Sequence, residues 1–195
     1  MDDTAMTKKR IYFLKVPVDI VDEETSLSLI GDMIEGKMNQ QIMFLTMAKL
    51  FRARRNMLFY KCLYESALIL PSARGIIRGI RSLRKISASR YNPFDYIISL
   101  LSYAEKNGHS VYFFGGKKDV LEKAERNVRT SFPRLTIIGR YAGYIDPEAE
   151  SNVITAIKKS APAILLIGRG IRGKELWLYR HREELKTGVA VWFDD

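Results

Sequence analysis

The chain has 195 residues, 47% of them hydrophobic, and its 32 Lys and Arg against 22 Asp and Glu give a formal charge of +10. This composition excludes a disordered tail, and the length predicts a single domain over residues 1–195 with one sizeable core. The single cysteine excludes an internal disulfide, and the longest apolar run, residues 161–168, is too short to span a bilayer. We therefore expect a cytoplasmic protein whose membrane contacts are peripheral.

Short apolar, β-branched or aromatic runs alternate along the chain with segments of helical periodicity. The runs predict buried strands over residues 11–16, 42–46, 67–70, 111–114, 136–138, 163–167 and 189–193. The other segments predict helices over residues 24–35, 93–107, 119–131, 147–159 and 174–186. Strands that alternate with helices predict an α/β fold, a Rossmann-like and mostly parallel sheet with helices on both faces.

The positive charge is concentrated in residues 49–90, the basic segment, which holds eleven basic residues and one acid. A helix over residues 74–85 would carry one basic stripe, formed by Arg74, Arg78, Arg81 and Lys85. Its apolar residues, Leu83 among them, would take the opposite side and pack inward. Such a basic face is either merely solvated or bound to an anionic partner, which can be lipid headgroups, pyrophosphate or nucleic acid.

Residues directly after each predicted strand are candidate site residues, because ligands of open parallel sheets bind beyond the carboxyl ends of the strands. Gly115 and Gly116 lie between a strand and a helix, where they either bring N–H groups and a helix N-terminus against a diphosphate or form only a tight turn. The glycine-rich run 168–173 comes late in the chain, so we do not expect a dinucleotide site after the first strand. Cys62 is expected in the core, and no metal ion or cofactor is predicted.

Six segments at these strand ends resemble, in order, the motifs of the WecG/TagA/CpsF family of bacterial glycosyltransferases. They are residues 46–48 (T-x-N in the family), 70–75 (L-P-D-G-x-G), 90–96 (R-x-x-G-x-D-L), 115–124 (G-G-x-x-x-V-x-x-x-A), 139–144 (G-x-x-x-G-Y) and 168–177 (G-x-G-x-P-x-Q-E-x-W). No segment is specific alone, but the ordered set is, and the resemblance covers nearly the whole chain.

The resemblance implies a Rossmann-like enzyme that moves an N-acetylhexosamine such as N-acetylmannosamine from a UDP-sugar donor to a polyprenyl-diphosphate-linked sugar acceptor. This is a step of teichoic-acid, common-antigen or capsule synthesis at the inner face of the plasma membrane. The resemblance also implies catalysis without a metal, an anionic membrane surface as a partner and assembly into a homo-oligomer, and nucleic acid is not an expected partner. The family's basic C-terminal membrane appendage is expected to be absent or truncated here.

The resemblance also implies the roles of single residues. Catalytic positions are Thr46, Ser72 and Asp95, and Ser72 stands where the family has its proposed Asp base. Substrate-binding positions are Arg74, Arg90, Gly115, Gly116, Tyr144, Gly168, Gly170, Lys174 and Glu175. A serine hydroxyl cannot accept a proton as a carboxylate does, so Asp95 and Glu175 are the remaining candidate bases, unless each only forms a structural ion pair or hydrogen bond.

Two hypotheses follow for the function of the chain. In the first, it is a divergent glycosyltransferase whose activity is impaired by the loss of the base at Ser72. In the alternative, it is a non-catalytic module that holds acidic lipid or nucleic acid through its basic surface.

Overall fold

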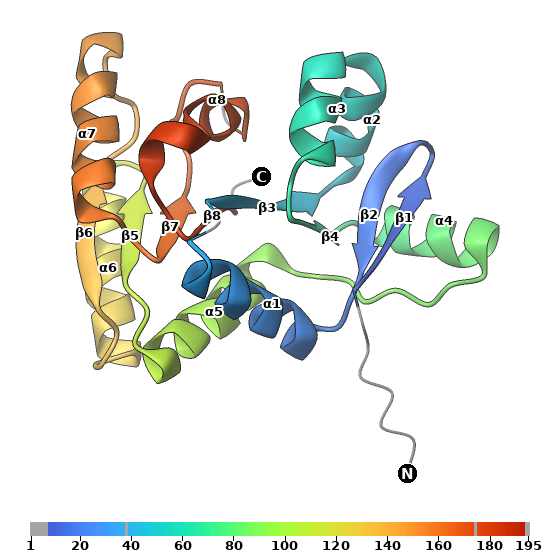
Figure 1. Cartoon of the computed structure of the whole chain (residues 1–195), viewed down its shortest axis with the longest axis horizontal. Helices are drawn as coiled ribbons and strands as arrows, with labels where there is room; N and C mark the ends of the chain where they lie inside the picture. The colour runs from blue at the N-terminus through green and yellow to red at the C-terminus, as the bar shows by residue number, and fades with distance from the viewer. Residues whose placement is uncertain (1–7, 38, 174, 194–195) are drawn as a thin grey trace.

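The computed structural model describes residues 8–37, 39–173 and 175–193, and its centre is a six-stranded sheet between two layers of helices (Figure 1). The strands lie in the order β4-β3-β8-β7-β5-β6, and each neighbouring pair is parallel. They are β3 (Gln40–Leu45), β4 (Leu68–Pro71), β5 (Val111–Phe114), β6 (Ile137–Tyr141), β7 (Ile164–Ile167) and β8 (Val189–Trp192). The predicted Rossmann-like α/β class is confirmed.

The helices divide between two faces of the sheet, as the alternation of side chains along each strand requires. On face A, Ile42 and Phe44 pack under α1 (Glu23–Glu35), α5 (Pro93–Asn107) and α6 (Lys118–Ser131). On face B lie α2 (Met47–Arg55), α3 (Met57–Tyr64), α7 (Glu150–Ser160) and α8 (Glu175–Leu185). Connections between parallel strands that pass over face A lead toward β6, and those that pass over face B lead toward β4. Because the direction reverses together with the face, all of these crossover connections have the same hand.

An antiparallel hairpin of β1 (Lys9–Phe13) and β2 (Val16–Ile20) stands where one strand over residues 11–16 was predicted. The prediction was wrong because Leu14 and Lys15 form a tight turn, with φ of 50° and 67° in the left-handed region. Neither residue type signals such a turn, so the apolar run appeared continuous in the sequence.

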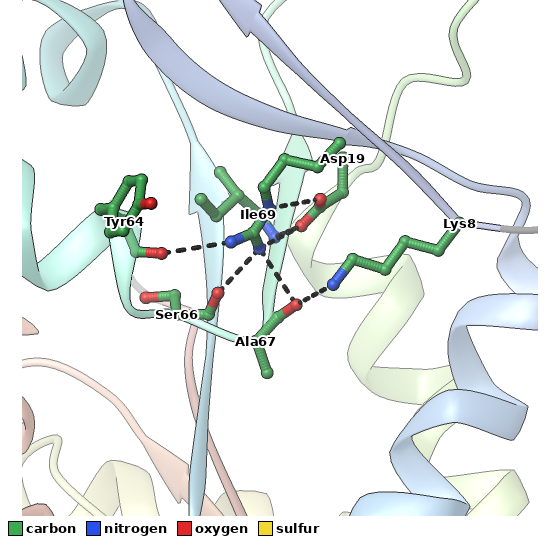
Figure 2. Close-up of polar contacts among 7 residues, drawn as sticks. Lys8, Asp19, Tyr64, Ser66, Ala67 and Ile69 are labelled. Atoms are coloured by element: carbon green, nitrogen blue, oxygen red, sulfur yellow. Dashed lines mark hydrogen bonds and ion pairs between the residues drawn. The ribbon is translucent and has the colours of Figure 1, made fainter.

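The hairpin covers the free edge of β4 through side-chain hydrogen bonds (Figure 2). The buried Asp19 carboxylate accepts two bonds of 2.8 Å from the Arg10 guanidinium and one of 2.8 Å from the Ile69 N–H. The same guanidinium donates to the carbonyls of Ser66 at 2.8 Å and Ala67 at 3.1 Å. These contacts leave no polar group of the ion pair unsatisfied, which is the condition for burying it.

Helix α4 (Arg74–Arg84) lies beyond β4 and packs against the hairpin. It differs from the predicted amphipathic helix over residues 74–85 in two ways. Ile76 and Ile80 are buried as expected, but the Leu83 side chain is 66% exposed. Lys85 is the C-cap in the left-handed region, with φ of 55°, so it lies outside the basic stripe.

Two other parts of the chain differ from the predicted helices. The predicted helix over residues 147–159 begins with a short 3₁₀ turn at Pro147–Ala149. Helices α2 and α3 had not been predicted.

The other helix boundaries follow from local capping. Helix α5 begins at Pro93 because the Asn92 side chain accepts a hydrogen bond from the Phe94 N–H at 3.1 Å. It ends at Asn107, and the C-cap Gly108 has a φ of 69°, which suits a residue without a Cβ. In the described part of the chain, no helix is both long and apolar enough to cross a membrane.

Candidate active site

The residues that follow β3, β4, β5 and β7 meet at the carboxyl edge of the sheet. They are Thr46, Ser72, Gly115 and Gly168. After β5 the chain turns to α6 on face A, whereas after β7 it turns to α8 on face B, so this pair of strands is a topological switch point. Only β8 separates β3 from β7, which corresponds to about 10 Å along the edge. The family segments are therefore brought to one side of the molecule.

Thr46 and Ser72 are both held by the backbone near the end of β3. The Thr46 hydroxyl caps α2 by accepting from the Lys49 N–H at 3.2 Å. The Ser72 N–H and the Ser72 hydroxyl each donate to the Leu45 carbonyl at 3.1 Å. The Thr46 hydroxyl is an acceptor in this bond, so its own O–H can donate to a ligand. The O–H of Ser72 is already used in the bond to the Leu45 carbonyl.

The loops around the end of β4 carry positive charge. The Tyr91 N–H donates to the Pro71 carbonyl at 2.9 Å, which holds the segment containing Arg90 against this strand end. Arg74 opens α4, whose first turn has neither an acidic residue nor a side-chain cap, so the helix dipole adds to the arginine charge. Asp95 is an exposed carboxylate in the first turn of α5, a few residues after Tyr91.

The glycines at the switch point allow three loops to pack closely. The Gly115 N–H donates to the Tyr141 carbonyl at 2.9 Å, and the Gly116 N–H donates to the Arg169 carbonyl at 2.7 Å. A Cβ on Gly115 would lie 2.8 Å from the carbonyl carbon of Gly168, so a side chain does not fit there. Both N–H groups are thus used inside the protein, as expected of a tight turn. Any role in diphosphate binding falls to the N-terminus of α6, which has no side-chain cap.

Tyr144 and Gly170 pack against each other beside these loops. Tyr144 has φ of 58°, in the left-handed region, and its N–H donates to the Gly170 carbonyl at 2.7 Å. A Cβ on Gly170 would lie 2.6 Å from the Tyr144 ring, so the glycine makes room for the ring. Left-handed backbone costs a non-glycine residue about 1 kcal/mol. The exposed Tyr144 ring offers a flat aromatic face on which a planar group can stack.

Glu175 lies in an ion-pair cluster inside face B. Its buried carboxylate is 3.1 Å from Lys49 Nζ and 3.5 Å from Arg52, and its backbone carbonyl accepts from Gln41 near the start of β3. Two cations therefore neutralise the Glu175 carboxylate. This arrangement is typical of a structural ion pair and not of a general base. Lys49 is buried here and is not part of the basic surface. Lys174, the neighbouring predicted residue, lies outside the described residues.

Cys62 lies in the core near this cluster, as predicted. Burial, with a smaller contribution from the negative charge of Glu175, raises the pKa of the Cys62 thiol to about 12. The thiol is therefore protonated at neutral pH and is not a nucleophile. Within the described ranges, no group of three or more His, Cys, Asp and Glu side chains is placed to hold a metal ion.

Comparison with known proteins identifies the family. A model of the Glycosyl transferase WecG/TagA/CpsF family matches residues 11–194. The chain belongs to this family.

Curated members are similar to part of the chain. It is 28% identical over 141 residues to an N-acetylglucosaminyldiphosphoundecaprenol N-acetyl-beta-D-mannosaminyltransferase of Bacillus spizizenii. It is 23% identical over 141 residues to a protein of the same description from Bacillus subtilis strain 168. Each alignment covers 72% of this chain and 54% of the relative, so the chain spans about half the length of these relatives.

Sequence reasoning missed one part of the surface beside the family segments. A pocket of about 430 Å³ opens on face A between α5 and α6 and reaches Gly116 and Arg169 at the switch point. We call it the α5–α6 groove. The family segment 115–124 could have indicated this groove. Its positions Val120 and Ala124 lie one turn apart on α6, and both line the groove.

Proposed function

We propose that this chain transfers an N-acetylhexosamine, in the first instance N-acetylmannosamine, from a UDP-sugar to a sugar linked through a diphosphate to a polyprenyl lipid. The observation that carries the proposal is the meeting of the family segments at one carboxyl edge, at Thr46, Ser72, Gly115 and Gly168. The names of the two relatives describe a mannosaminyl transfer to N-acetylglucosaminyldiphosphoundecaprenol, which supports the same class of acceptor.

We propose a division of the edge between the parts of the two substrates. The exposed Tyr144 ring stacks on the uracil of the donor, and the donor diphosphate extends from there toward Arg74 and Arg90. The sugars then lie toward Thr46 and Ser72. The end of β3 is about 14 Å from the end of β5 along the edge, with β7 and β8 between. The Thr46 hydroxyl is suited to donate a hydrogen bond to a sugar oxygen.

In the transfer, the acceptor hydroxyl oxygen forms a bond to the anomeric carbon while the bond from that carbon to UDP breaks. A base must take the hydroxyl proton, and cations must stabilise the departing diphosphate. Ser72 cannot take the proton, so we assign the base to Asp95, and Arg74 and Arg90 stabilise the negative charge. Since a well-placed base contributes about 10²–10⁴-fold, we propose that turnover is slow compared with that of a member carrying Asp at position 72.

Calorimetric titration with UDP and UDP-N-acetylmannosamine tests donor binding, and a transfer assay then compares three variants. Ser72→Asp is expected to raise the transfer rate about 100-fold or more, and Asp95→Asn to lower it. Ser89→Asp is the matched control, because it adds the same charge at an exposed position of the loop before Arg90.

The outcomes separate the two hypotheses. Absence of UDP and UDP-sugar binding at millimolar concentration would exclude the glycosyltransferase. Donor binding without turnover in both the unmodified chain and Ser72→Asp would favour the non-catalytic anion-binding module. That alternative draws support from the internal hydrogen bond of Ser72 and the internal pairing of Glu175.

We also propose that α4 contacts the anionic membrane surface on which the lipid-linked acceptor lies. Arg78 and Arg81 are exposed, and Leu83 adds an exposed apolar side chain. Each such cation is worth about 1 kcal/mol at an anionic surface. Self-association and the lack of nucleic-acid binding stay predictions.

Sedimentation with vesicles of increasing anionic lipid content tests this contact. The double variant Arg78→Gln, Arg81→Gln is expected to bind about 30-fold more weakly. Lys158→Gln with Lys159→Gln, the same change of charge at exposed positions of α7, is the control. An equal loss of binding in both double variants would contradict a specific role of α4.

A further inference from the structure

The α5–α6 groove is an apolar surface that the fold leaves open. Its floor is formed by Phe113 of β5 and Leu166 of β7, and its walls by α5 and α6. Phe94 on α5 is 69% exposed, and Val120 on α6 is 56% exposed. Large apolar side chains gathered in one open groove mark a binding surface more often than a solvated one.

One end of the groove opens at the switch point of the candidate active site. Gly116 and Gly168 line this mouth together with Arg169, which is exposed. Among the described lining residues, Arg169 is the one charged side chain. The N-terminus of α6 holds the exposed Lys117, Lys118 and Asp119, so its net charge is positive and adds to the helix dipole at the same mouth. The surface therefore passes from a cationic mouth directly into an apolar channel.

This order of charges and apolar surface matches one chemical class of ligand. A prenyl diphosphate has a doubly charged group joined directly to a branched hydrocarbon chain, so anionic and apolar parts follow each other without a spacer. Phosphates, free sugars and nucleotides have no apolar part that would use the groove. A second copy of the chain would need no cationic mouth at this position.

We propose that the α5–α6 groove holds the part of the acceptor's prenyl chain nearest to its diphosphate, with Arg169 and the α6 N-terminus at the diphosphate. This inference rests on the proposed function, since it names how the same site takes its lipid-linked acceptor. It gives the chain a means of drawing the first prenyl units out of the membrane surface. The sugar is thereby held at the carboxyl edge rather than at the height of the lipid headgroups.

Farnesyl diphosphate and inorganic diphosphate are suitable probes, because they share the charged group and differ in the prenyl chain. We expect the chain to bind farnesyl diphosphate at least about 10-fold more tightly than inorganic diphosphate by calorimetry, because the groove removes apolar surface from water. Phe94→Asp and Val120→Asp are expected to abolish this preference. Both residues are exposed and lie in the first turns of α5 and α6, where an acidic residue suits the helix dipole.

Met57→Asp is the matched control. Met57 is 80% exposed and begins α3 on face B, so the change adds the same charge to a helix N-terminus far from the groove. It is expected to keep the full preference for farnesyl diphosphate. Equal affinity for the two probes, or groove variants that keep the preference, would overturn the proposal.

Donor binding and sedimentation on the same variants separate the remaining outcomes. If UDP-sugar binding is intact and the preference for farnesyl diphosphate is absent, the groove proposal fails while the proposed function stands. If the preference is present without UDP-sugar binding, the groove stands and the proposed function fails. Groove variants that change the oligomeric state but keep the preference would assign the groove to a second copy of the chain.

Discussion

Lys49 Nζ lies 3.1 Å from the Glu175 carboxylate, and both side chains are buried. The second cation, Arg52, is 3.5 Å away and partly exposed. The two helices α2 and α8 are thus joined by a charge pair that is largely buried. Such a pair is costly to break, because the remaining partner keeps its charge without the solvation that it had before folding.

Replacing Glu175 by Gln is expected to lower the free energy of unfolding by about 3 kcal/mol, because the buried Lys49 loses the carboxylate that lies 3.1 Å from its Nζ. The measurement is urea denaturation at neutral pH. Glu184→Gln, an exposed carboxylate on the same helix, is the control and should change the stability by less than about 0.5 kcal/mol.

The double variant Glu175→Gln, Lys49→Met tests the physical reason. Because both charges are then removed, it is expected to be more stable than Glu175→Gln alone. A double variant that is no more stable than Glu175→Gln would argue that the buried lysine charge is not the source of the loss.

Two glycines in the loops of the switch point are needed for different reasons. Gly143 is needed because there is no space for a side chain, and Gly116 because of its left-handed backbone. A Cβ on Gly143 would lie 2.4 Å from the Arg169 carbonyl oxygen, so Gly143→Ala is expected to cost about 2–3 kcal/mol in the free energy of unfolding. Gly116 has φ of 74° but open space around it, so Gly116→Ala should cost only about 1 kcal/mol. Thermal unfolding of the two variants compares them. Equal losses would contradict the close approach of the 143 and 169 loops.

The Cys62 thiol gives a prediction on reactivity. Its pKa is raised from 9.0 to about 12, so the thiolate fraction at pH 8 is about 1000-fold smaller than for an ordinary thiol. Alkylation by iodoacetamide is therefore expected to be slower in the folded protein than in urea by at least that factor. Rapid alkylation without denaturant would show that the thiol is accessible.

The same shift has a consequence for stability at high pH. The unfolded chain loses the thiol proton near pH 9, whereas the folded chain keeps it until about pH 12, so proton loss favours the unfolded state between these values. Stability should decrease over this range by a larger amount in the unmodified chain than in Cys62→Ala. Identical pH profiles of the two proteins would contradict the shift.

Asp22 caps α1, and its contribution should depend on pH in the opposite direction. The hydrogen bond from the Thr25 N–H, 2.7 Å long, lowers the pKa of the Asp22 carboxyl below its ordinary value of 3.8. The carboxylate therefore stabilises the fold above that pH, and the stabilisation is lost as the pH falls through the folded-state pKa. Asp22→Ala should cost about 1 kcal/mol at pH 7, and the difference should shrink below pH 3.8.

Asp32→Ala is the control for this measurement. Asp32 is exposed in the last part of α1, so its loss removes the same charge without removing a cap. We expect no loss of stability at pH 7 and no comparable pH dependence. An equal effect of both substitutions would assign the change to net charge rather than to capping.

Elements with strong local signals could be predicted from the sequence. The bounds of β5 and α5 agree with the predictions, because the apolar run 111–114 is short and bounded, and because Asn92, Pro93 and Gly108 mark the helix ends. The sequence also predicted that Thr46 and Ser72 lie at the carboxyl ends of two strands. These are features that each segment carries in its own residues.

Features that depend on distant partners could not be predicted. The turn at Leu14 and Lys15 is stabilised by the contacts of Arg10 and Asp19 with the segment around Ile69. The pairing of Lys49 with Glu175 joins residues far apart in the sequence, so Lys49 was counted with the basic surface. The internal use of the Gly115 and Gly116 N–H groups likewise requires knowledge of where the other loops lie.

The hairpin gives the sheet two unequal edges. A strand from another molecule could add to β4 only by displacing Asp19 from the Ile69 N–H and Arg10 from the neighbouring carbonyls. At the opposite edge, β6 has β5 as its one neighbour in the described ranges, and the Arg140 side chain is paired with Glu122 and Glu125 of α6. Addition of a strand from another molecule is therefore opposed on the β4 side, and β6 is the edge at which the sheet could be extended.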